Sequence, residues 1–208
     1  MTRRSQSSSR WLQEHHSDPY VRRARAEGWR SRAVYKLEEV DKKERLLRHG
    51  SIVLDLGAAP GAWSQYARTK VGPKGRVVAS DILPMEALPG VQFVQGDFRE
   101  EQVADRLIAL TGARAVDVLL SDMAPDLSGM DVIDQPRSMY LSELALDMAS
   151  RVLKAGGGAL IKVFQGGGFQ ELVVAARRQF KTVRFIKPAA SRARSAEIYL
   201  LASGLRLV

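Results

Sequence analysis

Residues 52–66 read IVLDLGAAPGAWSQY, and this stretch decides the fold. The apolar run Ile52–Leu56 predicts a buried strand that carries Asp55 and ends at Gly57. A second glycine follows, and a helical pattern begins near Trp63, so we expect a strand, a tight turn and a helix. Glycine lets a ligand approach the backbone, and a helix N-terminus offers free N–H groups. The stretch therefore predicts a site for a nucleotide-like molecule.

The spacing of the glycines narrows the class of ligand. A dinucleotide site has the pattern G-x-G-x-x-G, and a phosphate loop has G-x-x-x-x-G-K-[ST]. Neither pattern is present at this turn. Asp55 followed by Gly57-Ala-Ala-Pro-Gly61 instead resembles motif I of the S-adenosylmethionine (SAM) methyltransferases. An ordinary glycine-rich turn between a strand and a helix has the same local pattern, so other stretches must decide.

Composition excludes several classes of protein. A chain of 208 residues is long enough for one domain with a sizeable core. It has no cysteine, which excludes disulfides, thiolate metal sites and the covalent nucleophile of cytosine-C5 methylation. No apolar run approaches 18 residues, and the N-terminus lacks the apolar region of a secretory signal. We expect a cytoplasmic protein that holds no metal.

The charge of +9 is unevenly distributed. Residues 1–50 hold 13 Lys and Arg and 7 Asp and Glu, whereas residues 51–176 hold 11 and 15. Residues 177–196 hold 7 basic residues and no acidic ones. Two basic ends flanking an acidic middle favour binding of a polyanion such as nucleic acid. A solvated basic surface without a partner is the alternative.

Apolar runs and helical patterns alternate along the chain. We expect strands at 52–56, 75–81, 91–94, 116–120, 159–164, 183–186 and 196–202. We expect helices at 18–28, 31–47 (with Ser31 as N-cap), 63–71, 99–110, 138–153 and 169–179, and loops at 126–136 and 187–196. This alternation predicts an α/β fold with a largely parallel sheet.

Three acidic residues end or follow predicted strands. Ligands of open parallel sheets gather at the carboxyl ends of the strands, where Asp81, Asp97 and Asp122 would lie. Asp81 can bind both ribose hydroxyls of a nucleoside. Nicotinamide sites share this geometry, so Asp81 does not indicate which cofactor binds. Asp97, beside Phe98, suits an adenine amino group, or it is the N-cap of the following helix.

Lys162 stands inside the apolar run ALIKVF. A charge in a buried strand is costly unless it is paired or lies at an edge. Burial and a nearby cation would lower the pKa of this lysine and let it accept a proton. The alternative is that its ammonium group extends to the surface. For Lys36 and Glu197, too, there is a purely structural interpretation. Lys36 would be a surface lysine, and Glu197 would be an exposed acid at the end of a strand.

Eight short stretches carry a more specific signal. They are SSSRWLQEH, SRAVYKLEEV, DLGAAPGAWSQY, QGDF, SDMAPDLSG, MYLSELAL, KVFQG and SRARSAEIYL. Through them the chain resembles, over essentially its whole length, the FtsJ/RrmJ (RlmE-type) 2′-O-ribose methyltransferases of large-subunit ribosomal RNA. The resemblance implies a Rossmann-like SAM-dependent methyltransferase fold, with a seven-stranded, mostly parallel sheet flanked by helices. We expect a basic, partly flexible segment over residues 1–30 and a single methyltransferase domain over 31–208.

The resemblance also implies site residues. The family's catalytic set falls on Lys36, Asp122, Lys162 and Glu197, with Lys162 as the general base. The implied cofactor contacts are Asp55, Gly57, Gly61, Trp63, Asp81, Asp97 and Asp122. Two departures from the family pattern, Ala62 for a glycine and Asp126 for an asparagine, do not touch the catalytic positions.

These residue types fit transfer to a ribose hydroxyl. The neutral amine of Lys162 could take the proton of a 2′-hydroxyl group as it attacks the methyl group of SAM. Lys36 would lower the pKa of Lys162, whereas Asp122 and Glu197 would raise it. The titration of the group is therefore coupled, and no single pKa belongs to one residue.

The implied substrate is a uridine in the peptidyl-transferase A-loop of large-subunit (23S) ribosomal RNA, modified in the assembled subunit by a monomeric enzyme. We expect Arg32, Arg192 and Arg194 to contact RNA phosphates. A 2′-O-methyltransferase of transfer RNA and a non-catalytic RNA-binding assembly factor are the alternatives. The glycine spacing and the basic flanks disfavour a nicotinamide-dependent oxidoreductase. An N6-adenine methyltransferase would have Asn/Asp-Pro-Pro-aromatic where this chain has Asp-Met-Ala-Pro.

Overall fold

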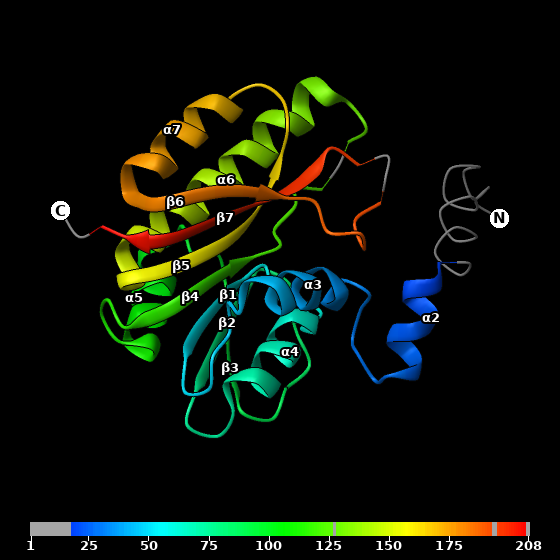
Figure 1. Cartoon of the computed structure of the whole chain (residues 1–208), viewed down its shortest axis with the longest axis vertical. Helices are drawn as coiled ribbons and strands as arrows, with labels where there is room; N and C mark the ends of the chain where they lie inside the picture. Colours follow the sequence, from blue (N-terminus) through cyan, green and yellow to red (C-terminus); the bar gives the residue numbers. More distant parts are fainter. Residues whose placement is uncertain (1–17, 127, 193–194, 207–208) are drawn as a thin grey trace.

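A twisted sheet forms the centre of the molecule (Figure 1). In the computed structural model, which describes residues 18–126, 128–192 and 195–206, the sheet has seven strands in the order β3-β2-β1-β4-β5-β7-β6. The strands are β1 (Ile52–Leu56), β2 (Arg76–Asp81), β3 (Val91–Gln95), β4 (Val116–Ser121), β5 (Leu153–Phe164), β6 (Phe180–Ile186) and β7 (Glu197–Leu205). All are parallel except β7, which is antiparallel to both β5 and β6. The predicted seven-stranded, mostly parallel α/β fold is confirmed.

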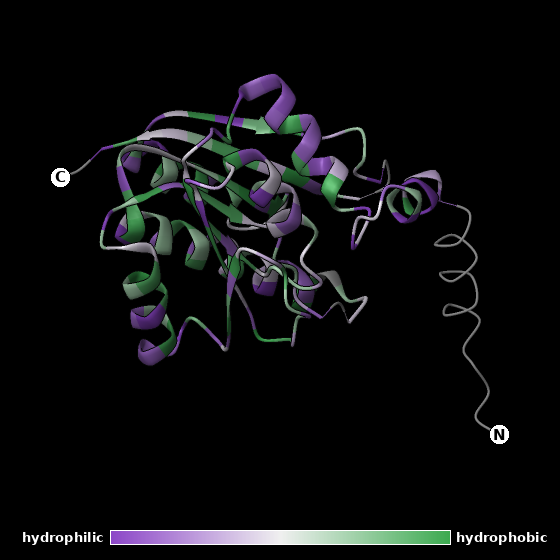
Figure 2. Cartoon of the chain, turned by 90° about the horizontal axis from the view of Figure 1, so that it is seen from below, coloured by the Kyte–Doolittle hydropathy of each residue, from purple (hydrophilic) through white to green (hydrophobic). Residues whose placement is uncertain are grey.

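Helices cover both faces of the sheet. They are α3 (Val34–Glu44), α4 (Ala62–Val71), α5 (Glu101–Thr111), α6 (Asp131–Val152) and α7 (Phe169–Gln179), whereas α2 (Pro19–Ala26) lies to one side of the sheet (Figure 1). One apolar core joins the sheet to α3 and α4, and the other joins it to α5, α6 and α7. Apolar residues concentrate on the strands and on the helix faces turned towards them (Figure 2). None of the helices in the described part of the chain is long and apolar enough to cross a membrane.

Helix α3 carries Lys36 and packs on the sheet as its apolar spacing predicts. Leu37 and Val40 are completely buried. Ser31 is not its N-cap, because the helix begins after Ala33. Within residues 31–36, the backbone N–H groups of residues 34–36 instead each donate to the carbonyl three residues earlier. The Ser31 hydroxyl accepts the N–H of Ala33.

The predicted loop at 126–136 is wrong in its second half. Helix α6 begins at Asp131 and contains Pro136. The side chain of Asp134 accepts hydrogen bonds from the N–H and hydroxyl of Ser128 and from the N–H of Gly129, so it closes the turn that precedes the helix. The pattern gave no helix signal because Val132 and Ile133 are exposed and because proline usually ends a helix.

Strands β5 and β6 begin earlier than their sequence predicts. The glycines at 156–158 lie outside the predicted strand 159–164 but within β5, whose pairing with β4 shifts register between Val116 and Val118. Pairing with β7 extends β6 back to Phe180. Partner strands therefore determine these ends.

Asp41 fixes the end of α3 against α4. Its buried carboxylate accepts the N–H of Leu47 at 2.7 Å and the hydroxyl of Tyr66 at 3.0 Å. A buried donor that loses its acceptor retains the full cost of desolvation. This contact therefore contributes to the position of the helix that carries Lys36.

We predict that Asp41→Ala lowers the free energy of unfolding by about 2–3 kcal/mol, because it leaves two donors unsatisfied. Urea denaturation measures the change. The control is Lys42→Ala, which removes an exposed pair with Glu38 and should cost only about 0.5 kcal/mol or less. Equal losses for the two variants would contradict the role given to Asp41.

Candidate active site

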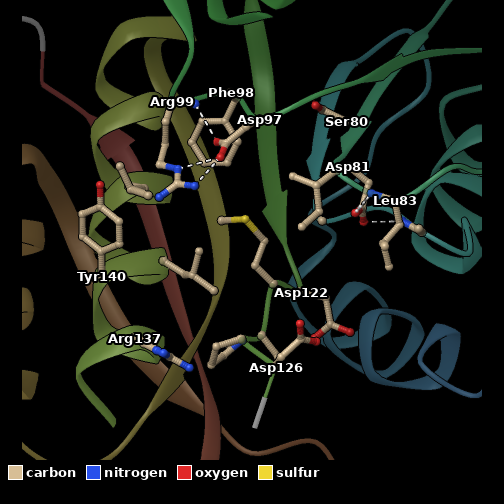
Figure 3. Close-up of a pocket in the computed structure, with 18 of the residues that line it drawn as sticks. Ser80, Asp81, Leu83, Asp97, Phe98, Arg99, Asp122, Asp126, Arg137 and Tyr140 are labelled. Carbon is tan, nitrogen blue, oxygen red and sulfur yellow. Dashed lines mark hydrogen bonds and ion pairs between the residues drawn. The ribbon is translucent and has the colours of Figure 1, made fainter. Parts of the chain in front are cut away.

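A cavity of about 440 Å³ opens at the carboxyl ends of β1 to β4 (Figure 3). Gly57, Asp81, Asp97 and Asp122 all line it, as predicted from their positions after strands. A hollow of about 20 Å³ lies on the other side of the glycine turn. Asp55, Gly57, Trp63 and Asp122 line this hollow, so it adjoins the larger cavity.

The two glycines of the turn are required by close packing. Gly57 has φ +72°, and a Cβ atom there would lie 2.5 Å from Cγ of Met123. Gly61 has φ +107°, and a Cβ atom would lie 2.9 Å from side-chain atoms of both Met85 and Leu88. The loops after β1, β2 and β4 are thus packed to the limit that glycine allows.

Asp55 is a completely buried carboxylate with one free oxygen. Its Oδ2 accepts the hydroxyl of Ser64 at 2.6 Å, whereas Oδ1 has no hydrogen-bond partner among the described residues. Burial raises the pKa of Asp55 to about 7; the Ser64 bond opposes this rise, and the charge of Asp122 adds to it. A ligand donor that reached Oδ1 would satisfy this oxygen and favour the charged form.

Asp81 ties two loops of the cavity together. Oδ2 accepts the N–H of Ala59 in the glycine turn at 2.8 Å, and Oδ1 accepts the N–H of Leu83 at 2.9 Å. Each oxygen keeps a lone pair for a ligand. The side chain is therefore already oriented towards the cavity.

Asp97 is held by Arg99 at the wall of the cavity (Figure 3). Nε of Arg99 donates to Oδ2 at 2.7 Å, and the Arg99 N–H donates to Oδ1 at 3.0 Å. The bonds from Arg99 lower the pKa of Asp97, although burial acts in the opposite direction. The N-cap alternative is wrong, because Glu100 precedes the first residue of α5. The Asp97 carboxylate remains at the cavity, beside Phe98.

The four predicted catalytic residues converge on one point. Nζ of Lys162 lies 2.8 Å from Oδ1 of Asp122 and 3.7 Å from Oε2 of Glu197. Nζ of Lys36 lies 2.7 Å from Oε1 of Glu197 and 3.9 Å from Oδ1 of Asp122. Their side chains are 8–17% exposed, so neither Lys36 nor Glu197 is an ordinary surface residue. We call these four residues, after the role predicted for them, the catalytic cluster.

Strand pairing explains why the cluster forms. Lys162 lies opposite Tyr199 in the β5–β7 pair, and Glu197 lies two residues before Tyr199, so the three side chains project from one face of the sheet. Pairing between β4 and β5 ends at Ser121 and Ile161. The next carbonyl, that of Asp122, is therefore free to accept Nζ of Lys162 at 2.8 Å.

Tyr199 and Ser191 belong to this network, and the sequence analysis missed both. The buried Tyr199 hydroxyl donates to Oδ1 of Asp122 and accepts Nζ of Lys36 at 3.1 Å. Ser191 donates its hydroxyl to Oε1 of Glu197 at 2.8 Å. A tyrosine two residues after Glu197 in an apolar strand is the signal that could have revealed the first.

The protonation of Lys162 differs from its prediction. The side chain does not extend to the surface. Burial lowers the pKa of Lys162, but the charges of Asp122 and Glu197 outweigh burial, and the net pKa lies above its usual value. The predicted lowering is therefore wrong for the free protein. Burial would raise the pKa of Asp122, yet Lys162 and then Lys36 bring it below its usual value.

Comparisons with known proteins agree with this geometry. Residues 29–205 match the family model described as FtsJ-like methyltransferase. The chain belongs to the FtsJ-like methyltransferase family. It is 59% identical to ribosomal RNA large subunit methyltransferase E of Legionella pneumophila strain Corby, over 98% of this chain and 99% of that protein. It is 56% identical to the protein of that name in Xanthomonas oryzae pv. oryzae strain PXO99A, over 100% and 99%.

A solved structure shares the fold. It is a Plasmodium falciparum chain whose crystal structure is described as that of a ribosomal RNA methyltransferase. The two chains superpose with a TM-score of 0.74 at 29% identity, over 85% of this chain and 98% of the other. The fold is thus shared at a sequence identity far below that of the bacterial relatives.

The predicted RNA-binding arginines of this FtsJ-like methyltransferase lie in different environments. The Arg32 side chain is 16% exposed; it pairs with Asp18 and donates to the carbonyl of Ala190. Arg192 is half-buried in the loop at 187–196. Arg194 lies outside the described residues, as do residues 1–17, which include the whole of SSSRWLQEH.

The basic run at 177–196 is divided by β6. Arg177 and Arg178 lie in the last turn of α7, and Lys181 is the second residue of β6, so these three cations lie at the opposite end of the sheet from the catalytic cluster (Figure 1). Only the part of the run that follows β6 lies near the cluster. Among the described residues, no group of His, Asp and Glu side chains is arranged to hold a metal ion.

We predict that Asp55→Asn stabilises this FtsJ-like methyltransferase, and that the gain grows between pH 5 and pH 8. The folded pKa of about 7 lies above the unfolded value of 3.8, so wild-type stability falls as pH rises through this window. The asparagine stays neutral and escapes this loss. Thermal unfolding at the two pH values measures the difference. Asp105→Asn, at an exposed acid of α5, is the control; a pH-independent gain for Asp55→Asn would contradict the raised pKa.

Proposed function

We propose that this chain transfers a methyl group from SAM to the ribose 2′-hydroxyl of a uridine in large-subunit ribosomal RNA. The observation that carries the proposal is the convergence of Lys36, Asp122, Lys162 and Glu197 within 2.7–3.9 Å at the edge of a cavity suited to a nucleoside. The names of the bacterial relatives support the choice of RNA.

The residues around the cavity fit SAM. The free Oδ1 of Asp55 is an acceptor for an ammonium group, and the Gly57–Gly61 turn brings the backbone close to a ligand. The second lone pairs of Asp81 suit two ribose hydroxyls, and Asp97 beside Phe98 suits the adenine amino group and ring. Trp63 closes the smaller hollow. When bound, SAM supplies a methyl group that is already activated by its positively charged sulfur.

Lys162 is the proposed general base. A ribose hydroxyl becomes a good nucleophile only as its proton leaves, so an amine must stand within hydrogen-bond reach of O2′. Asp122 and Glu197 fix the direction of Nζ, and Lys36 brings the group to two cations and two anions. The neutral hydroxyl of Tyr199 donates to Asp122. The 2′-hydroxyl loses its proton to Lys162 while the oxygen takes the methyl group.

This role requires the pKa of Lys162 to fall when the substrates bind. In the free protein the two carboxylates hold the proton on Nζ. A positive charge brought beside Nζ, in a site from which water is excluded, favours the neutral amine. The catalytic cluster thus keeps Lys162 charged until the cavity is filled.

The proposed substrate is the A-loop of the assembled large subunit, modified by a monomer in the cytoplasm. Arg192 and Arg194 would contact phosphates from the loop at 187–196, with exposed Arg22 and Arg25 of α2 as further contacts. Arg32 would act by holding this loop, because its guanidinium is bound to Asp18 and Ala190. Phosphate contacts position the RNA, and base contacts select the nucleotide.

One experiment tests the two alternatives, in which the substrate is transfer RNA or the protein is a non-catalytic assembly factor. The protein is incubated with labelled SAM and either undermodified large subunits, free ribosomal RNA or transfer RNA, and ribose methylation is mapped. The proposal predicts one methylated uridine in the subunit sample. Label in transfer RNA alone, or no label with any substrate, would contradict it.

We predict that Lys162→Ala lowers the single-turnover rate by at least about 1,000-fold, because the proton acceptor is removed. SAM binding, measured by calorimetry, should remain within about threefold of wild type, since the cofactor contacts are intact. Lys154→Ala, at an exposed lysine paired with Asp117, is the matched control and should retain full activity. Transfer at a near wild-type rate by Lys162→Ala would exclude this residue as the base.

We predict that Arg192→Gln weakens RNA binding and reduces the slope of log K against log salt by about 1, because one phosphate contact is lost. Filter binding to undermodified subunits between 50 and 200 mM salt, about the range in which such contacts lose strength, measures both quantities. Arg106→Gln, at an exposed arginine of α5, is the control. An unchanged slope for Arg192→Gln would contradict the phosphate contact.

A further inference from the structure

The connection between α2 and α3 makes more long-range hydrogen bonds than a simple linker needs. We call residues 27–33 the bracing segment. Its Arg30 guanidinium donates to three carbonyls, those of Pro60 at 3.0 Å, Glu86 at 2.7 Å and Ala87 at 2.9 Å. Three acceptors on one guanidinium hold it in a fixed position.

The three carbonyls belong to the two loops of the proposed cofactor site. Pro60 lies in the glycine turn after β1, and Glu86 and Ala87 lie in the segment that follows Asp81. A Cβ atom on Gly61 would lie 3.0 Å from Nη1 of Arg30, so the guanidinium is packed against the turn itself. Arg30 thus joins two loops that the side chain of Asp81 also links.

Gln65 and Trp63 hold the bracing segment against α4. The Gln65 amide accepts the N–H of Arg30 at 3.1 Å and donates to the carbonyl of Gly28 at 2.9 Å. Nε1 of Trp63 donates to the carbonyl of Ala33 at 2.7 Å. The backbone around Arg30 is therefore fixed on the helix that starts at the glycine turn.

Arg32, two residues later, points to the other side of the site. It pairs with Asp18 at the start of α2 and donates to the carbonyl of Ala190. The next residue along the chain, Ser191, donates its hydroxyl to Glu197 in the catalytic cluster. Arg32 therefore holds the loop that orients one catalytic carboxylate.

We propose that the bracing segment fixes the position of the two halves of the site relative to each other. Arg30 is a positioning residue for the cofactor loops, and Arg32 is a positioning residue for Glu197. The inference rests on the proposed function, because it takes SAM as the ligand of the larger cavity. Loops that are already ordered bind a ligand without a further loss of conformational entropy. Removing Arg30 therefore affects cofactor affinity, and removing Arg32 affects the transfer step.

The chain contains a matched control for a purely structural role. Arg76, at the start of β2, donates to the carbonyls of Leu110 and Thr111 at 3.1 and 3.2 Å. It is an exposed arginine that joins two segments through carbonyl bonds, at the opposite end of the parallel strands from the cavity. If carbonyl bonding by arginine contributes only to stability, Arg30→Met and Arg76→Met will behave alike.

The test uses the full-length chain and measures SAM and S-adenosylhomocysteine binding by calorimetry, without RNA. We expect Arg30→Met to weaken both ligands by about tenfold, which is the effect of losing one or two net hydrogen bonds. Arg30→Lys, which keeps a cation with three donors, should recover most of this loss. Arg76→Met should bind both ligands as wild type does, even if its melting temperature falls by as much as that of Arg30→Met.

The transfer step is measured separately, at saturating SAM on undermodified subunits. Arg30→Met should then recover a near wild-type rate, giving a raised KM for SAM with kcat retained. Arg32→Met should show the reverse, with wild-type SAM affinity and a rate at least about tenfold lower. Equal SAM affinity in Arg30→Met and wild type, or equal losses in Arg30→Met and Arg76→Met, would overturn the inference. Failure of the wild-type chain to bind SAM would instead refute the proposed function.

Discussion

The site depends on one electrostatic arrangement, in which two lysine ammonium groups share a buried space with two carboxylates. Each partner is costly to bury alone, and each is acceptable because the others are within about hydrogen-bond distance. The fold supplies the four side chains from separate elements: Lys36 from α3, Asp122 from the end of β4, Lys162 from β5 and Glu197 from β7. The antiparallel β7 is essential to this arrangement, because it places its first residue, Glu197, beside the last residues of β5.

Two buried ionisable groups, Asp55 and Lys162, have features in the free protein that a bound ligand would change. Asp55 keeps one oxygen without a partner among the described residues, and burial raises its pKa to about 7. Lys162 keeps its proton because Asp122 and Glu197 outweigh the effect of burial. Both groups would change protonation in the same direction if a cation entered the site, since a positive charge favours an ionised carboxylate and a neutral amine. A bound methyl donor with an ammonium group beside Asp55 and a positively charged sulfur beside Lys162 would explain both features.

The sequence predicted the order of strands and helices because buried strands are continuous apolar runs and because glycine marks the turns between elements. It did not predict the start of α6, where a carboxylate contact at Asp134 outweighs the signal of Pro136. It placed the four proposed catalytic residues only through motifs, since their meeting depends on strand register, which no local pattern records. It also missed Tyr199 and gave Lys162 the wrong direction of pKa shift, because both depend on distances between residues far apart in the chain.

The most direct measurement is a titration of the Lys162 side-chain nitrogen by NMR in three states: the free protein, the complex with SAM and the complex with S-adenosylhomocysteine. These two ligands differ in the positive charge on sulfur, and the second also lacks the methyl group. The account predicts a pKa above the usual lysine value in the free protein and a pKa that is lower with SAM than with S-adenosylhomocysteine. Equal pKa values in the two complexes would contradict the claim that the charge of the methyl donor releases the proton from Lys162.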